Sequence, residues 1–336
     1  MNEYVTLAHG SGGKMTHMLI KDIFYRYFRN DLLLAGGDSA VFEADKGLMA
    51  FTTDSYVISP IFFKGGNIGK IAVCGTVNDL AVSGAKPKYL SCGFIIEEGF
   101  PIRDLETIAR SMAETAAEAG VCLVTGDTKV VQKGCADRIF INTAGVGVVP
   151  DYVTLSANRI KSGDAVILSG TMGDHGTAIL LEREGLKVKS SIASDCAPLA
   201  GMIESVMSEY ADAVHIMRDP TRGGVATALN ELIDGTGLCI ELKEKFLPVR
   251  EEVKGVCELL GMDPLYMANE GKVIIIADGA CAGEIVDKIK KSPYGREATI
   301  IGVVTENYSG RVLLNTIVGG NRVIDVLTGD QLPRIC

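Results

Sequence analysis

The sequence contains no tryptophan, only four histidines, and few aromatic residues, which make up 6% of the chain. No stretch of about eighteen residues is free of charge, so the sequence predicts no membrane span. The N-terminus has no basic region followed by an apolar run and a cleavage site, which argues against a secretory leader. The nine cysteines include no C-x-x-C pair, which argues against a disulfide scaffold or a zinc finger. We therefore expect a cytoplasmic protein.

Positive charge is also in short supply. The 33 lysines and arginines face 42 aspartates and glutamates, which gives a formal net charge of −9. This charge argues against nonspecific binding to nucleic acid and to anionic membranes. An acidic protein that handles phosphates must gather its cations locally or recruit metal ions.

The chain of 336 residues exceeds what one hydrophobic core usually serves, so we expect two domains. Strand-like apolar runs alternate with helical patterns, which predicts a mixed α/β fold. A helix follows Pro101 and stops at Gly120, and a short strand then leads into a polar turn that begins at Thr125. We predict further strands over 138–149, 165–168 and 272–277, and helices over 222–233 and 251–260.

Turn residues mark the boundaries. The polar stretch 150–164 predicts a division into domains 1–150 and 151–315. Beyond Asn315 the sequence is rich in glycine and turn residues, so we expect no regular element and predict a mobile tail over 316–336. Twenty extended residues span roughly 60 Å, so the last residue could reach a distant site.

Two glycine-rich segments, His9–Lys14 and Lys64–Lys70, suggest phosphate cradles. Neither is a P-loop, because Ala8 and Lys64 stand where that motif needs glycine, and Met15 and Ile71 stand where it needs Ser or Thr. Glycines still let backbone N–H groups approach an anion, and both segments lead into predicted helices. The alternative for each segment is a flexible turn.

Four aspartates, Asp38, Asp54, Asp79 and Asp127, stand at the polar ends of short apolar runs. Carboxylates on strand-end loops could converge to hold Mg²⁺, which prefers oxygen ligands and often bridges to phosphates. Aspartate is also a common turn residue, which is the alternative for any one of them. Asp79 differs from the others because its apolar neighbours predict a buried helix, where an unpaired charge is costly.

The second half has three polar segments at element boundaries. Gly170–Gly176 follows a predicted strand and Arg218–Gly224 precedes a predicted helix, and both are positions that favour anionic groups. Glu270 stands just before a strand, where a carboxylate can act as a general base. The alternatives are a helix cap at Asp174, a turn at Pro220 and a solvated Glu270.

The last residue, Cys336, is not a prenylation signal, because that signal needs three residues after the cysteine. A neighbouring carboxylate discourages thiolate formation, whereas Arg334 or a cationic pocket would encourage it. The sequence therefore predicts a thiol that becomes nucleophilic where it docks. The alternative is an accidental terminal thiol.

Nine short motifs, beginning with Gly-Ser-Gly-Gly near the N-terminus, are spread over essentially the whole chain. They are Gly10–Gly13, Gly37–Ser39, Thr52–Asp54, Gly75–Ala81, Thr125–Lys129, Gly173–Gly176, Asp219–Gly224, Asn269–Gly271 and Pro333–Cys336. In this order they resemble the HypE family of hydrogenase maturation factors. The first motifs alone indicate the wider superfamily of aminoimidazole ribonucleotide synthetase, thiamine monophosphate kinase and selenophosphate synthetase, and the terminal cysteine narrows the resemblance to HypE.

The resemblance implies a two-domain PurM-like fold in which the N-terminal sheets of two subunits form a barrel and make a homodimer. It also implies that the carbamoyltransferase HypF loads a carbamoyl group onto Cys336. The enzyme would then dehydrate this thiocarboxamide to a thiocyanate with ATP and Mg²⁺. The cyano group would pass to iron held by the HypC–HypD complex, for the [NiFe]-hydrogenase centre.

The resemblance assigns roles to residues as well. Cys336 is the carrier. Since two protons must leave the nitrogen, the chemistry of this reaction makes Glu270 the first candidate for the base, Lys129 a second group that orients or deprotonates the nitrogen, and His175 a weaker candidate. The sequence leaves open whether Lys129 or Lys133 approaches the tail. The metal would be held by Asp38, Asp54, Asp79 and Asp127. The nucleotide would contact Gly12, Gly13, Asp38, Lys64, Asn78, Asp79, Gly126, Asp127 and Thr128.

Two other interpretations stay open. One keeps the ATP site but makes the substrate a free small molecule. Among such enzymes, selenophosphate synthetase is disfavoured, because its reactive cysteine or selenocysteine lies near the N-terminus and no cysteine precedes Cys74 here. The other is a carrier or scaffold that binds nucleotide without catalysis.

Overall fold

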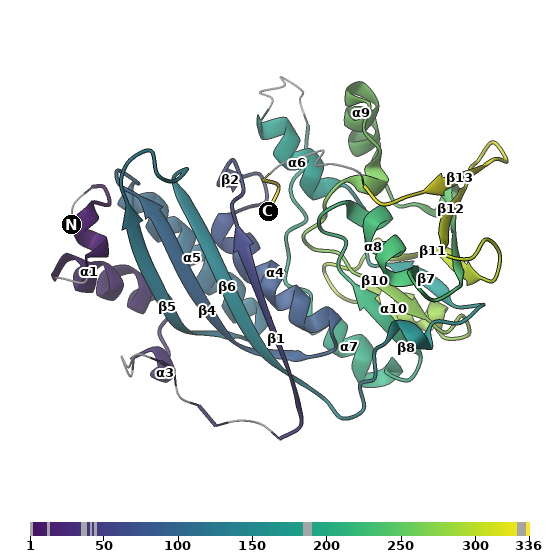
Figure 1. The fold of residues 1–336 in the computed structure, drawn as a ribbon, viewed down its shortest axis with the longest axis horizontal. Helices are drawn as coiled ribbons and strands as arrows, with labels where there is room; N and C mark the ends of the chain where they lie inside the picture. Colours follow the sequence, from purple (N-terminus) through teal and green to yellow (C-terminus); the bar gives the residue numbers. More distant parts are fainter. Residues whose placement is uncertain are drawn as a thin grey trace.

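The structure is a computed structural model of the chain and describes residues 3–11, 14–34, 39–40, 42–43, 46–183, 190–327 and 334–336. Two halves, each built on a β-sheet with helices, lie side by side (Figure 1). The predicted mixed α/β class is confirmed. Within the described ranges, the helices are too short or too polar to cross a bilayer.

The strands are β1 (Leu48–Tyr56), β2 (Phe62–Phe63), β3 (Gly66–Asn67), β4 (Lys86–Glu97), β5 (Cys122–Val131), β6 (Ile139–Val149), β7 (Ala165–Leu168), β8 (Val214–Arg218), β9 (Cys239–Lys243), β10 (Ile274–Ala277), β11 (Thr299–Thr305), β12 (Arg311–Asn315) and β13 (Asn321–Ile324). The helices are α1 (Lys14–Leu19), α2 (Tyr25–Tyr27), α3 (Asp31–Leu34), α4 (Ile68–Val82), α5 (Ile102–Ala119), α6 (Asp174–Arg183), α7 (Ala200–Tyr210), α8 (Gly224–Ile233), α9 (Glu251–Leu260) and α10 (Ala282–Lys290). A π-helical turn, Ile20–Phe24, joins α1 to α2, and short 3₁₀ turns complete the chain.

The N-terminal half is a four-stranded sheet in the order β1-β6-β4-β5, with β4 and β5 parallel and the other pairs antiparallel. Helices α4 and α5 cover one face. The predicted helix after Pro101 is confirmed as α5, which buries Leu105, Ile108 and Met112 at helical spacing. It ends at Gly120, whose φ of 70° lies in the left-handed region that favours glycine.

Helix α4 lies between the two halves and is buried along almost its whole length. The side chain of Asn67 caps it by accepting from the backbone N–H groups of Gly69 and Lys70 at 2.9 and 3.1 Å. Its far side packs against α7 and β8 of the second half. The buried helix predicted around Asp79 is therefore confirmed, and α4 holds the two halves together.

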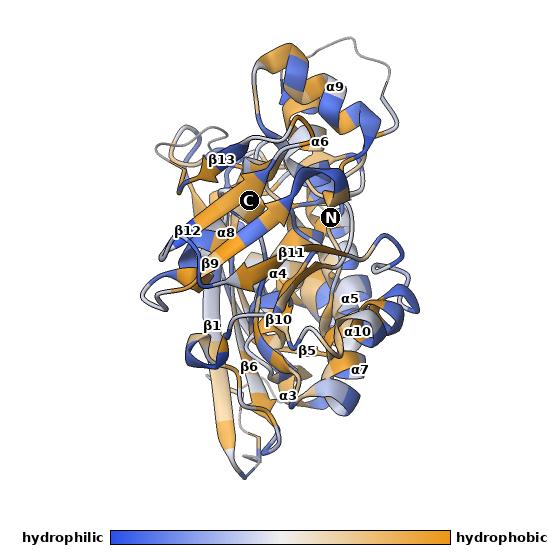
Figure 2. Cartoon of the chain, turned by 90° about the vertical axis from the view of Figure 1, so that its right-hand side faces the viewer, coloured by the Kyte–Doolittle hydropathy of each residue, from blue (hydrophilic) through white to orange (hydrophobic). Residues whose placement is uncertain are grey.

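The other face of the N-terminal sheet is apolar and exposed. Side chains alternate between the faces of a strand, and on this face Met49, Phe51 and Ile95 are 46%, 71% and 45% exposed. Figure 2 shows the lower end of β1 in orange, the hydrophobic colour. Apolar patches of this kind mark interaction surfaces.

The second half is a seven-stranded sheet in the order β13-β12-β9-β11-β7-β10-β8. Its pairs are antiparallel except for β12 and β9. Helices α7 and α10 pack together on one face, and α8 packs against β9 and β12 on the other. The strands predicted over 138–149 and 165–168 and the helix over 251–260 are confirmed as β6, β7 and α9, within a residue at each end.

Two predictions about local structure were wrong. The segment that begins at Thr125 is not a turn, because β5 continues to Val131 by pairing with β4. The region beyond Asn315 does contain a regular element, since β13 forms a hairpin with β12. In both places pairing with a neighbouring strand overrides turn-forming composition.

Candidate functional site

The end of the chain docks between the two halves. In Figure 1 the C-terminus lies between β2 and α6, far from the N-terminus. The backbone N–H of Val57 donates to the main-chain oxygen of Cys336 at 3.1 Å, and that of Ser59 donates to the carbonyl of Arg334 at 3.3 Å. The tail end therefore adds to the segment that follows β1 as a short strand would. Ile335 and Cys336 are each only 6% exposed and belong to the main core cluster.

Side chains from the second half hold two of the tail residues, Arg334 and Ile335. His175 of α6 contacts the carbonyl oxygen of Ile335 through Nε2 at 2.8 Å. Arg183, at the end of α6, donates to the carbonyls of Arg334 and Ser59. Because these contacts reach backbone atoms, they bind the tail through its main chain.

The sulfur of Cys336 meets one cation. The Nε–H of Arg222, in the loop before α8, donates to Sγ at 3.2 Å. Burial nevertheless raises the pKa of the Cys336 thiol to about 11, with Glu270 adding to the rise and Arg222 opposing it. The prediction that the thiol becomes nucleophilic where it docks was therefore wrong, because burial outweighs the cation and keeps the docked sulfur protonated.

Glu270 lies in this pocket and is only 3% exposed, so the solvated alternative was wrong. Burial raises the pKa of its carboxyl well above the ordinary range, and the nearby Cys196, Asp195 and Asp219 raise it further. Its Oε1 atom has no hydrogen-bond partner among the described residues. A buried carboxyl with an unpaired oxygen next to the carrier thiol has the properties of a general base.

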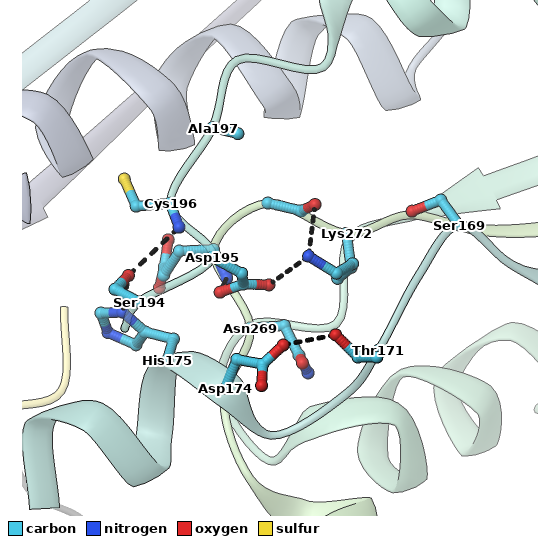
Figure 3. Close-up of polar contacts among 12 residues, drawn as sticks. Ser169, Thr171, Asp174, His175, Ser194, Asp195, Cys196, Ala197, Asn269 and Lys272 are labelled. Carbon is cyan, nitrogen blue, oxygen red and sulfur yellow. Dashed lines mark hydrogen bonds and ion pairs between the residues drawn. The ribbon is translucent and has the colours of Figure 1, made fainter. Parts of the chain in front are cut away.

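A buried polar network supports Glu270, and Figure 3 shows two of its members, Asp195 and Lys272. Lys272 and Asp195 form an ion pair at 3.0 Å, with side chains 8% and 4% exposed. Asp195 also accepts the backbone N–H of Glu270 at 3.0 Å. Lys272 holds the pKa of the Asp195 carboxyl below its usual value despite burial. The network therefore fixes the main chain that carries Glu270.

Asp174 lies near the same ion pair, since Asp195 and Lys272 both influence the pKa of its carboxyl, which burial raises. It begins α6, and its carboxylate accepts from the hydroxyl of Thr171. An arginine, Arg250, lies 3.4 Å from its other oxygen. Asp174 is thus the first residue of the helix and contacts side chains through its carboxylate, so the helix-cap alternative stays a prediction.

Three further carboxylates influence one another at the junction of the halves. The hydroxyl of Thr52 donates to Asp79 at 2.9 Å. Burial raises the pKa of the Asp79 carboxyl, and Asp54 raises it further. Burial and the nearby Asp79 raise the pKa of Asp219 to about 7. Arg218 opposes the rise at both Asp79 and Asp219, and a further cation at this place would favour their ionised forms.

The three aspartates that the structure describes do not stand on strand-end loops as expected. Asp54 lies within β1, Asp79 within α4 and Asp127 within β5, while Asp38 lies outside the described residues. Asp54 shares the face of β1 with Thr52, which contacts α4. Asp127 pairs in register with Gly93, and its side chain lies on the opposite, exposed face of the sheet. Its strand, β5, is three strands away from β1, which separates the two strands by roughly 14 Å.

No group of three or more potential metal ligands occurs among the residues that the structure describes. Within one chain, the side chains of Asp54 and Asp127 lie on opposite faces of the N-terminal sheet. Their metal roles stay predictions.

Lys129 shares the exposed face with Asp127 and forms an ion pair with it at 3.1 Å. Its side chain is 65% exposed, and it pairs in register with Ile95. The strand β1, whose continuation binds the tail, lies at the other edge of the sheet. Lys129 of one chain is therefore not brought to its own Cys336.

Asn78 and Lys64 serve contacts between the two halves. Asn78 in α4 is buried; its amide nitrogen donates to the carbonyl of Ala197 at 3.1 Å, and its oxygen accepts from Leu199 at 2.8 Å. Lys64 donates to the carbonyl of Ser190 at 2.9 Å. Their predicted contacts with nucleotide stay predictions, and these bonds explain the two residues without a ligand.

Gly126, Asp127 and Thr128 line a cavity of about 190 Å³ between β4, β5 and the N-terminal helices. Thr16 and Phe24 form the opposite wall. Gly126 accepts no side chain, since a Cβ there would lie 2.5 Å from the carbonyl oxygen of Cys92. The glycines Gly12 and Gly13 lie outside the described residues.

Comparison with known proteins gives the family. The models for the N-terminal and C-terminal domains of AIR synthase related proteins match residues 36–149 and 161–315. Carbamoyl dehydratase HypE of Bradyrhizobium diazoefficiens is 48% identical over 335 residues, which cover 100% of this chain and 97% of that protein. The chain belongs to the HypE family. The resemblance drawn from the motifs is thereby confirmed.

Solved HypE structures share the fold. Hydrogenase maturation protein HypE in complex with ATP matches with a TM-score of 0.95 at 45% identity, over 98% of this chain and 99% of that one. A HypE–HypF complex matches with a TM-score of 0.81 at 48% identity, over 92% of this chain and 99% of that one. The two-domain PurM-like fold is therefore confirmed.

Sequence reasoning missed several residues of the site. Arg183, Ser194, Asp195 and Lys272 contact the tail or support Glu270, yet none was assigned a role. The loop that contains Ser194 and Asp195 shows no motif, and only its buried partners identify it. Arg222 belongs to the motif Asp219–Gly224, just before α8, and this position before a helix is the sequence feature that could have indicated its role.

Proposed function

We propose that this chain is an ATP-dependent carbamoyl dehydratase that converts a carbamoyl group on the sulfur of Cys336 into a cyano group, which serves as a ligand of iron in [NiFe]-hydrogenase maturation. The observation that carries the proposal is the docking of Cys336 beside Glu270 and Arg222, inside the core of a HypE-family fold. ATP is the second substrate.

The reaction removes water from a thiocarboxamide. The carbamoyl oxygen attacks the γ-phosphorus of ATP, so a new P–O bond forms, the bond between the β and γ phosphates breaks, and ADP leaves. The nitrogen gives up one proton as the C=N bond forms. It gives up the second when phosphate departs and the S–C≡N group is complete. Phosphorylation is needed because an amide oxygen is otherwise a poor leaving group at neutral pH.

Glu270 is the base for the nitrogen in this proposal. Its raised pKa makes the carboxylate a stronger base than an exposed glutamate, and its unpaired Oε1 leaves an oxygen available to the substrate. Arg222 lies against the sulfur and stabilises negative charge that develops on the thiocarboxamide. Burial of the tail end keeps water from the reacting group.

Magnesium fits the carboxylates at the junction. Burial is the main cause of the raised pKa values of Asp79 and Asp219, and neighbouring carboxyl groups add to it. These carboxyl groups supply the oxygen ligands that this ion prefers. Asp54 and Asp79 would hold it, with Asp38 and Asp127 as the remaining candidates. When bound, the ion neutralises charge on the phosphates. We place the nucleotide near Gly126, Thr128, Lys64 and the glycines Gly12 and Gly13.

The tail must undock for the steps that involve other proteins. Docked Cys336 is buried, and its thiol stays protonated at neutral pH, so it is a poor acceptor for a carbamoyl group. We therefore propose that the part of the chain that follows β13 is the carrier, with Cys336 loaded by HypF and unloaded to the HypC–HypD complex, in the cytoplasm. The relative captured as a HypE–HypF complex supports the first of these partners.

A homodimer completes the proposal. The exposed apolar face of the N-terminal sheet, which contains Met49 and Phe51, suits pairing with a second copy to form a barrel. Lys129 and Asp127 stand on this same face. They would lie at the contact between subunits, which is where Lys129 can take part as a second polar group.

Mass spectrometry of the C-terminal peptide tests the function. Protein loaded by HypF is incubated with Mg-ATP, and the peptide should lose the mass of one water while ADP appears. Cys336→Ala should accept no carbamoyl group. A small-molecule enzyme would instead keep its ATP turnover in this variant, and a scaffold would release no ADP, so either result contradicts the proposal.

A further inference from the structure

His175 takes part in a continuous chain of hydrogen bonds that reaches the tail. The backbone N–H of Cys196 donates to Oγ of Ser194 at 3.1 Å. That oxygen lies 2.8 Å from Nδ1 of His175, and Nε2 of His175 lies 2.8 Å from the carbonyl oxygen of Ile335. Figure 3 shows Ser194 next to the ring.

The chemistry of these groups fixes every proton in the chain. A carbonyl oxygen only accepts, so Nε2 of His175 carries a proton and donates it to Ile335. A backbone N–H only donates, so Oγ of Ser194 accepts from Cys196 and has its own hydrogen to give. The neutral ring offers Nδ1 as the acceptor for that hydrogen. Each ring nitrogen is thereby occupied while the tail is docked.

The groups around the ring favour its neutral form. His175 is fully buried, and burial lowers the pKa of its imidazole; Arg183 acts in the same direction, while Asp195 and the carbonyl of Ile335 oppose it. Phe63 packs edge-on against the ring, with centroids 5.7 Å apart. A neutral ring held on three sides has a single orientation.

The segment Ser194–Ala197, which we name the strap, also holds the main chain of Glu270. Asp195 accepts the N–H of Glu270 at 3.0 Å, and Ala197 donates to the carbonyl of Glu270 at 3.4 Å. A Cβ on Gly271 would lie only 1.9 Å from the carbonyl oxygen of Asp195, so the two backbones touch. Neighbouring residues of one strap therefore position the tail and Glu270.

We propose that His175 is a positioning residue and not a base: with Ser194 it clamps the tail through the carbonyl of Ile335, and the strap aligns the clamped tail with Glu270. The inference deepens the proposed function, since it rests on Cys336 as the carrier. It assigns a recognition site to the main chain of the penultimate residue, so this part of docking does not depend on the chemical state of the sulfur.

A pair of substitutions separates the two ring nitrogens. In His175→Gln the side-chain amide reaches the position of Nε2 and can still donate to Ile335. In His175→Asn it reaches only the position of Nδ1, so the clamp is lost. Ser194→Ala keeps the ring but removes the group that fixes its tautomer. His17→Asn, on the exposed side of α1, is the matched control.

Alkylation of Cys336 by iodoacetamide measures docking, because only the undocked thiol reacts. Cleavage before Asp330 releases a C-terminal peptide in which Cys336 is the only cysteine, so the other thiols do not interfere. We expect the rate to rise about tenfold in His175→Asn, as for one lost hydrogen bond, and about threefold in Ser194→Ala. His175→Gln and the control should stay within about twofold of the unsubstituted protein.

Equal rates in the Asn and Gln variants, or an unchanged rate in His175→Asn, would overturn the clamp. Thermal melting of each variant identifies loss of folding, and Ser194→Ala keeps the test valid if His175→Asn does not fold. A second measurement follows nitrile formation against pH in His175→Gln. A positioning role leaves the shape of the profile unchanged, whereas a base at His175 would remove activity at every pH. Failure of the unsubstituted protein to form nitrile would sink the proposed function but leave the alkylation result standing.

Discussion

The Nε atom of Arg222 lies 3.2 Å from the sulfur of Cys336 and donates its hydrogen to it. The two residues come from the loop before α8 and from the last position of the sequence, so the contact exists only when the tail is docked. Sulfur is a weak acceptor, and the charge of the guanidinium strengthens the bond. Arg222 therefore contributes to docking as well as to the electrostatics of the site.

Replacing Arg222 by Met should weaken docking of the tail. The backbone N–H groups of Val57 and Ser59 donate to tail carbonyls, so their hydrogen exchange reports on the docked state. We expect exchange of the peptide that contains them to accelerate about tenfold, as for one hydrogen bond to a charged group. Arg110→Met, an exposed arginine on α5 beside Tyr27, is the control and should leave this peptide unchanged.

Glu270→Gln should lower the rate of nitrile formation by a factor of about 10² to 10⁴, the usual contribution of a general base. In the unsubstituted protein the rate should increase with pH, because the raised pKa keeps Glu270 protonated to a higher pH than an exposed glutamate. Single-turnover experiments with ¹³C-labelled carbamoyl groups, followed by NMR, measure both effects. A rate that is independent of pH and unaffected by the substitution would exclude Glu270 as the base.

The same carboxyl should make the folded protein less stable at high pH. An unfolded glutamate titrates near 4.3, roughly, whereas folding raises the pKa of Glu270. Between these two pKa values the folded state holds a proton that the unfolded state has lost, so stability falls as pH rises through this window. Glu270→Gln removes this dependence on pH. The unfolding free energy of the variant, relative to that of the unsubstituted protein, should therefore increase with pH by at most about 1.4 kcal/mol per pH unit. Urea unfolding from pH 5 to 8 tests the sign.

Much of the fold could be predicted because its signals are local. The spacing of Leu105, Ile108 and Met112 and the stop at Gly120 are sufficient for α5. By contrast, β5 beyond Thr125 and the strand β13 exist because a neighbour pairs with them, and no local pattern records that partner. Composition alone therefore suggested turns and an unstructured tail.

The site was predictable in part for the same reason. Glu270 and Cys336 stand out in the sequence, and the structure brings them together. The support for them does not stand out, since Asp195 becomes informative only when Lys272 is seen 3.0 Å away. The thiol pKa was predicted in the wrong direction because burial depends on the whole fold, whereas the cation near it was visible in the motif.

Removing Lys272 should destabilise the protein strongly. Lys272→Met leaves the carboxylate of Asp195 buried without its cation, a change that costs about 3–5 kcal/mol when one partner of a buried pair is lost. Lys254→Met, which removes an exposed pair with Glu251 on α9, should cost less than about 0.5 kcal/mol. Urea unfolding of both variants at pH 7 gives the comparison. Equal costs would show that the buried pair does not support the site.

The proposed homodimer depends on the exposed face of the N-terminal sheet, and Phe51 is the most exposed aromatic residue on it. In Phe51→Glu, two carboxylates would have to enter the contact between apolar faces, which costs several kcal/mol per dimer because neither has a cation to pair with. Sedimentation velocity should therefore show a monomer at concentrations where the unsubstituted protein is a dimer. Phe246→Glu, a half-exposed phenylalanine in the other half of the molecule, is the matched control and should remain dimeric. A dimer that persists in Phe51→Glu would place the subunit contact elsewhere on the surface.

Nitrile formation by the monomeric variant then tests whether Lys129 acts between subunits. The activity is retained if one chain holds a complete site, and it is lost if Lys129 acts across the contact on the partner's tail.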